Sequence, residues 1–344
     1  MSVRFARSGG LLAGAAATAL VLGACGSGPT TDGDRVRVVA STNVWGSVVR
    51  AVGGDAVEVR SILDSPEVDP HSYESTPSDA AEVSDAQLVV YNGGGYDPFV
   101  DKILSSSAGG DRRTVEAVKA ADITQTVAAA PSAAPSDTPD GHGHRDEHGD
   151  EHKERQEAAA HEAEHDHDHG VNEHVWYDVH AVGHVAEQVA GRLGEIKADR
   201  KDEFRRNAER LVGELRKLDA KIEDLAGSYG GTKILVTEPI AFYLVRQAKL
   251  DDVTPQVFVR AVEEENDPPA AAIAEVERLV ASGEPRVLIY NPQTESVVTQ
   301  QVRAKAEAAK IPVVRMTETL PAGKDYLSWM SGQVDDLAAA LRQR

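Results

Sequence analysis

The sequence predicts an α/β protein whose two lobes, each with a parallel sheet, are joined by one long rigid helix. Short β-branched segments alternate with segments of helical periodicity in both halves of the chain, an order that favours parallel sheets with right-handed crossovers. Residues 199–229, near the middle, carry a single apolar stripe on an otherwise charged segment. Aromatic residues make up only 5% of the chain, and this low content, with Ala, Val and Leu abundant, suits helices packed on parallel strands.

The first lobe is predicted at residues 34–195. We expect strands at 36–41, 57–63 and 87–91, and helices at 45–52, 79–85 and 180–195. Pro77 and Ser78 precede the second helix, where a proline and a capping residue are typical of a helix start.

The linking helix is predicted at residues 199–229. Its apolar residues recur at spacings of four and three: Phe204, Ala208, Leu211, Leu215, Leu218, Ile222 and Leu225. A helix of about thirty residues spans on the order of 45 Å, so we expect it to act as a strut between the lobes.

The second lobe is predicted at residues 230–344. Its expected strands are 233–237, 254–259, 286–290 and 312–315, and its expected helices are 240–248, 270–282, 297–309 and 326–341. Two such lobes leave a cleft between them, and ligands in open α/β sheets bind at the carboxyl ends of the strands.

The N-terminus has the layout of a lipoprotein export signal over residues 1–24. Two arginines and a short apolar run lead to Leu22-Gly23-Ala24-Cys25, which matches a bacterial lipobox. An ordinary signal peptide that ends near a cysteine is the alternative. Residues 25–33 then form a flexible tether. Because Cys25 is the only cysteine, a metal site in this chain must use histidine and carboxylate ligands.

Residues 128–170 form a His/Asp/Glu-rich insertion that cannot bury a core, and we predict a disordered surface loop. Its interleaved ligands favour metal buffering, and a solvated insertion without a specific role is the alternative. The loop histidines are His142, His144, His148, His152, His161, His165, His167 and His169. The net charge of -20, with no basic patch to offset it, argues against nucleic acid as a partner.

Four side chains follow strands or loop ends, where they can converge on a cleft: His71, His174, Glu238 and Glu295. Two imidazoles and two carboxylates make a mixed nitrogen and oxygen shell for a divalent ion. Each residue also has an ordinary structural role open to it. His71 suits a solvated turn, His174 suits packing on an aromatic ring, and both glutamates suit helix caps.

The motifs around these residues resemble a known family. The stretch that begins Asp69-Pro70-His71 and continues to Val100, together with Asn172-Glu173-His174-Val175-Trp176-Tyr177-Asp178 after a His-rich insertion, is similar to the metal-binding lipoproteins of zinc and manganese ABC importers. The resemblance covers the chain from about Val36 onward. It implies two α/β lobes linked by a long helix, with a metal site in the interlobe cleft.

The resemblance also implies the ligands. His71 and His174 match the two N-lobe histidines of the family, whereas Glu238 stands where zinc members usually carry histidine and manganese members often carry glutamate. The last ligand is usually aspartate, and Glu295 takes its place, with Asn291 as an alternative. Neutral imidazole and the Irving–Williams order favour zinc, so zinc ranks first and manganese second.

The resemblance implies a binding protein and not an enzyme. The chain would be lipid-anchored at Cys25 on the outer face of the cytoplasmic membrane, monomeric, and partnered by an ABC permease. His180 and His184 share a helix face, but Ala181 stands where a metalloprotease helix needs glutamate. A secreted zinc hydrolase with Glu238 as base is a remote alternative, and an adhesin of the same fold is another.

Overall fold

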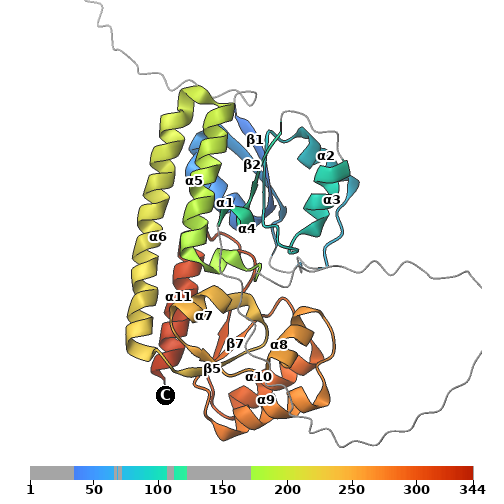
Figure 1. Ribbon diagram of the computed structural model, residues 1–344, viewed down its shortest axis with the longest axis vertical. Helices are drawn as coiled ribbons and strands as arrows, with labels where there is room; N and C mark the ends of the chain where they lie inside the picture. Colours follow the sequence, from blue (N-terminus) through green and yellow to red (C-terminus); the bar gives the residue numbers. More distant parts are fainter. Residues whose placement is uncertain (1–34, 66–67, 69–71, 107–111, 122–171, 344) are drawn as a thin grey trace, which may run out of the picture. The chain divides into compact units, whose positions relative to one another are not determined.

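The computed structural model describes residues 35–65, 68, 72–106, 112–121 and 172–343 (Figure 1). These residues belong to one compact unit that begins at Arg35. The predicted export signal, the tether, Cys25, His71 and the His-rich loop lie outside the described residues. Within the described part, no helix is both long and apolar enough to cross a membrane.

The N-lobe is built on a four-stranded parallel sheet in the order β2-β1-β3-β4. Its strands are β1 (Val36–Thr42), β2 (Val57–Leu63), β3 (Leu88–Tyr91) and β4 (Arg113–Glu116). Its helices are α1 (Asn43–Gly53), α2 (Pro77–Asp85), α3 (Pro98–Ser106), α4 (Ala117–Ala120) and α5 (Val179–Ile196). The strands expected from the sequence are confirmed to within a residue, and α3, β4 and α4 were not expected.

Alternate residues of the N-lobe strands enter two different cores. Val38 and Val90 pack in the cluster that includes α1 and α5, whereas Val39 and Val89 pack in the cluster that includes α2 and α3. Successive side chains of a strand point to opposite faces of the sheet, so helices on both faces bury a central strand on both sides. This arrangement explains the continuous apolar sequence of β3, whereas Arg37 of β1 and Glu58 of β2 are exposed.

The C-lobe repeats the plan with a parallel sheet in the order β6-β5-β7-β8. Its strands are β5 (Lys233–Val236), β6 (Asp251–Asp252), β7 (Leu288–Tyr290) and β8 (Val313–Arg315). Its helices are α7 (Phe242–Gln247), α8 (Gln256–Glu263), α9 (Ala270–Ser282), α10 (Val297–Ala308) and α11 (Tyr326–Arg342).

The strand expected at 254–259 is wrong, because residues 256–259 form the first half of α8 (Gln256–Glu263). Phe258, Val259 and Val262 are buried at helical spacing, while Val257 is 60% exposed. Pro255 stands directly before the helix, where a missing backbone N–H is harmless. The β-branched content of the segment suggested a strand, but its buried residues follow the helical period.

The long helix is confirmed as α6 (Lys201–Tyr229), preceded by one 3-10 turn at Ala198–Arg200. All seven residues of its predicted apolar stripe are buried. Figure 1 shows α6 lying beside α5 and α11, which both contact it. The core cluster that holds the stripe also holds Val38 of the first sheet and Ile234 of the second. The two lobes therefore share packing and are not joined by α6 alone.

Candidate metal site

His174 lies at the end of the segment that leads into α5, and its side chain is only 1% exposed. It precedes a single 3-10 turn, Val175–Tyr177. The imidazole packs edge-on against the Trp176 ring, with centroids 5.2 Å apart, and lies 6.1 Å from the Tyr96 ring. An imidazole buried among aromatic rings needs defined polar partners.

Asn172 determines which nitrogen of His174 carries the proton. The Asn172 Oδ1 atom accepts the backbone N–H of His174 at 3.0 Å and lies 3.2 Å from the ring Nδ1. The Asn172 Nδ2 atom donates to the carbonyl of Pro239, so the orientation of the amide is defined. An oxygen can only accept, so Nδ1 is the nitrogen that donates to Asn172, and in the neutral ring Nε2 would then have the lone pair that a metal needs.

Glu238 lies two residues beyond the end of β5 and is 3% exposed. Its carboxylate accepts hydrogen bonds from the Asn291 amide and from the Thr294 hydroxyl. Pro239, the next residue, accepts the Asn172 bond described above. The Asn172 side chain thus ties the backbone beside Glu238 to the segment that carries His174.

Glu318 is a second buried carboxylate in this region that the sequence analysis missed. It follows β8 and is 1% exposed, and its Oε1 accepts the Asn291 amide at 2.8 Å. Its Oε2 accepts the Tyr96 hydroxyl at 2.9 Å. One amide therefore donates to both Glu238 and Glu318. The sequence did contain a signal for Glu318, because this residue comes shortly after the strand predicted at 312–315, as Glu238 comes after the strand predicted at 233–237.

The segment that carries Glu318 is held at several points. Its backbone N–H donates to Gln293 Oε1 at 2.7 Å, and the carbonyl of Thr317 accepts the Tyr177 hydroxyl at 2.9 Å. Burial, followed by the charge of Glu318, raises the pKa of Tyr177 well above its ordinary value, and the charge of Glu238 adds to this rise. The two carboxylates thus concentrate negative charge at one place in the interior.

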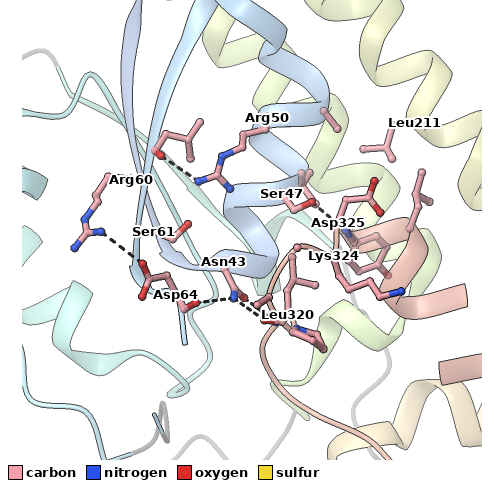
Figure 2. Close-up of a pocket in the computed structure, with 18 residues that line it drawn as sticks. Asn43, Ser47, Arg50, Arg60, Ser61, Asp64, Leu211, Leu320, Lys324 and Asp325 are labelled. Carbon is pink, nitrogen blue, oxygen red and sulfur yellow. Dashed lines mark hydrogen bonds and ion pairs between the residues drawn. The ribbon is translucent and has the colours of Figure 1, made fainter. Parts of the chain in front are cut away.

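Figure 2 shows how the chain beyond Glu318 is connected to the N-lobe. The Asn43 Nδ2 atom donates to the Leu320 carbonyl at 3.0 Å and to the Asp64 carbonyl at 3.3 Å, and Asn43 Oδ1 accepts the Leu320 N–H at 2.8 Å. These bonds border a cavity of about 570 Å³. None of His174, Glu238 and Glu318 lines it, so this cavity and the carboxylate cluster are separate features.

Glu295 has different partners. Its carboxylate accepts the Tyr290 hydroxyl, Arg303 Nη1 at 2.7 Å and Gln300 Nε2 at 3.1 Å. The Tyr290 bond and the Arg303 charge hold its pKa below the ordinary value. The structure brings His174 and Glu238 into one network, and it places Asn291 in that network and Glu295 in another.

His180 and His184 lie on the exposed face of α5. His180 Nε2 is 3.3 Å from an Asp219 carboxylate, and His184 Nδ1 is 3.9 Å from Glu187. Their side chains are 65% and 57% exposed. His180 and His184 are therefore surface histidines with acidic neighbours. This agrees with the sequence, in which Ala181 stands where a metalloprotease helix needs glutamate.

The fold and the site define a two-lobed α/β binding protein with a buried imidazole, His174, in one lobe and two buried carboxylates, Glu238 and Glu318, that share the Asn291 amide in the other. The family model described as zinc-uptake complex component A periplasmic (ZnuA) matches residues 38–340, and the chain belongs to this family.

Individual relatives agree with the assignment. The high-affinity zinc uptake system protein ZnuA of Bacillus subtilis is 24% identical over 336 residues, 95% of each chain. The manganese ABC transporter substrate-binding lipoprotein PsaA of Streptococcus pneumoniae is 37% identical over 78 residues, only 22% of this chain and 25% of that protein. The solved periplasmic zinc-binding protein TroA from Treponema pallidum has a TM-score of 0.67 at 18% identity, covering 89% of this chain and 99% of that one.

Proposed function

We propose that this chain is an extracytoplasmic solute-binding lipoprotein that captures a divalent transition metal, zinc, and delivers it to an ABC importer. The observation that carries the proposal is the pair of buried carboxylates, Glu238 and Glu318, which share the Asn291 amide beside the His174 network. Buried carboxylates are retained where they are hydrogen-bonded or bind a cation. Relatives named for zinc or manganese transport support the choice of cargo.

The proposed ligands are His71 and His174 from the N-lobe and Glu238 and Glu318 from the C-lobe. Glu318 is proposed in preference to Glu295, since Glu295 is engaged by Tyr290 and Arg303. The Asn291 amide is assigned a positioning role, because it holds the two carboxylates at a common point. A cation bound by both carboxylates would compete with that amide for their oxygen atoms.

Zinc is proposed as the cargo and manganese is the alternative. Neutral imidazole is a good ligand for zinc and a poor one for manganese, and zinc exceeds manganese in the Irving–Williams order. Glu238 makes the site harder than a three-histidine site would be. The preference for zinc over manganese therefore depends on the balance between the two imidazoles, which favour zinc, and the two carboxylates, which also suit manganese.

The remaining parts of the proposal concern residues outside the described ones. Cys25 would carry a lipid that anchors the chain to the outer face of the cytoplasmic membrane. The loop from His142 to His169 would buffer metal near the protein. We propose a monomer that meets an ABC permease and has no catalytic activity.

Competitive metal titration tests the ligand set. Zinc affinity should fall by at least about a hundredfold in each of E238Q, E318Q and His174→Ala, as expected for loss of one ligand or its support. The matched control E295Q should leave the affinity unchanged. A loss in E295Q with none in E318Q would overturn the choice of Glu318, and tight manganese binding with weak zinc binding would change the cargo.

A further inference from the structure

Glu263 lies beside the His174 segment although it belongs to α8 of the C-lobe. Glu173, His174 and Glu263 each offer one ligand atom, and these three atoms lie within 4.8 Å of one another. His174 is buried, whereas both glutamates are half-buried and so reach toward solvent. An imidazole with two carboxylates at this separation is a donor set that zinc accepts.

The position of Glu263 in its helix is unfavourable by itself. It is the last residue of α8, where the helix dipole destabilises a negative charge. Three further acidic residues follow within four positions and are exposed: Glu264, Glu265 and Asp267. A cation bound at this place would reduce the repulsion among these carboxylates.

His174 belongs to both donor sets. The Nδ1 atom of its ring lies 3.2 Å from Asn172 Oδ1. Glu173 is held beside it, because the Glu173 carbonyl accepts the Asn92 side chain at 2.9 Å. Glu173 and Glu263 lie within reach of an ion on His174, and under the proposed function the same imidazole also serves the buried Glu238 and Glu318.

We propose that Glu173, His174 and Glu263 form an outer zinc site that receives the ion from solvent and passes it to the buried carboxylates. This proposal rests on the proposed function, because the outer site would deliver zinc to the inner site formed with Glu238 and Glu318. Transfer is a ligand exchange in which the carboxylates stay ionised and the imidazole stays neutral, so no proton moves. His174 keeps hold of the ion while one pair of carboxylates replaces the other.

Stopped-flow mixing of the full chain with zinc alone tests the outer site. Tryptophan fluorescence is a suitable signal, because the Trp176 ring packs on His174. E263Q should slow zinc association by about tenfold or more, with little change in the final affinity. The matched control E264Q removes the same charge from the neighbouring exposed position and should change the rate less than about twofold.

A second comparison separates the outer site from the inner one. In the E238Q/E318Q background, a weaker zinc-dependent fluorescence change should remain, and adding E263Q should abolish it while adding E264Q should not. Equal rates for E263Q and E264Q, or no residual signal in the double variant, would overturn the outer site. Tight zinc binding by E238Q/E318Q would instead overturn the inner site of the proposed function. Circular dichroism checks that each variant is folded.

Discussion

Two asparagine side chains organise the candidate site at the scale of single residues. Asn172 links the His174 imidazole to the backbone beside Glu238, and Asn291 links the carboxylates of Glu238 and Glu318. An amide has two N–H donors and an accepting oxygen. Asn172 uses both kinds of group, whereas Asn291 uses its two N–H donors to join two carboxylates.

Asp97 stabilises a turn in the same region and has a raised pKa. It is fully buried, accepts the backbone N–H groups of Asn92 and Gly93 at 2.7 and 2.8 Å, and so holds the turn that carries Tyr96. Gly93 adopts φ of +73° in this turn, and a side chain there would collide with Glu116. Burial raises the pKa of Asp97 to about 6.

The raised pKa predicts a pH dependence of stability. Because the folded state binds the Asp97 proton more tightly than the unfolded state, its contribution is full below about pH 4 and is lost as pH rises to about 6. Urea unfolding should show the wild type losing up to about 3 kcal/mol relative to D97N across this window. A constant difference between the two proteins would contradict the assignment.

At the scale of elements, α6 provides the surface that both sheets use. Its stripe packs with α5 and α11, and Asn207 on the same helix donates to the Val52 carbonyl at 2.8 Å at the end of α1. A helix of this length is stabilised mainly by burial of its apolar face. Loss of one buried side chain from the α6 stripe should therefore lower the free energy of unfolding of both lobes together.

The variant Ile222→Ala tests this role. Ile222 is fully buried in the stripe, so the lost methylene groups and the cavity left behind should lower the free energy of unfolding by about 2–5 kcal/mol. Glu223→Ala, at the next and exposed position, should change it by less than about 0.5 kcal/mol. Urea denaturation measures both, and similar losses in the two variants would exclude the packing explanation.

At the scale of the whole molecule, the proposed metal site draws ligands from both lobes. An ion bound there would connect the carboxyl ends of strands in the second sheet to the segment before α5. Because the metal binds only the folded arrangement, its binding free energy adds to the stability of the folded state. The effect belongs to the molecule as a whole, since neither lobe alone has the full ligand set.

Zinc should therefore raise the melting temperature. Free zinc about a hundredfold above Kd should stabilise the protein by about 3 kcal/mol. Differential scanning calorimetry should show this shift in the wild type and lose it in His174→Ala. Deletion of His142–His169 should lower the number of bound zinc ions and leave the shift intact. A shift that vanished with the loop would place the tight site in the loop.

Much of the fold could be predicted from local patterns. Strand and helix periods are properties of neighbouring residues, so β1, β2, β3 and the α6 stripe were predicted nearly to the residue. The segment 254–259 failed because its β-branched residues favour a strand locally, whereas burial of Phe258 and Val262 on one face stabilises a helix. Propensity is a weak guide where tertiary packing decides.

The sequence by itself determined the two parallel sheets, the long helix, and His174 and Glu238 as site candidates, since each depends on a strand, a helix or a motif that is local. Only the tertiary structure decided which carboxylate accompanies Glu238. Glu295 and Glu318 both follow strands, but Tyr290 and Arg303 engage the first, while Tyr96 and Asn291 hold the second. Glu263 joins His174 for the same reason, because contacts between distant segments are set by packing and not by spacing along the chain.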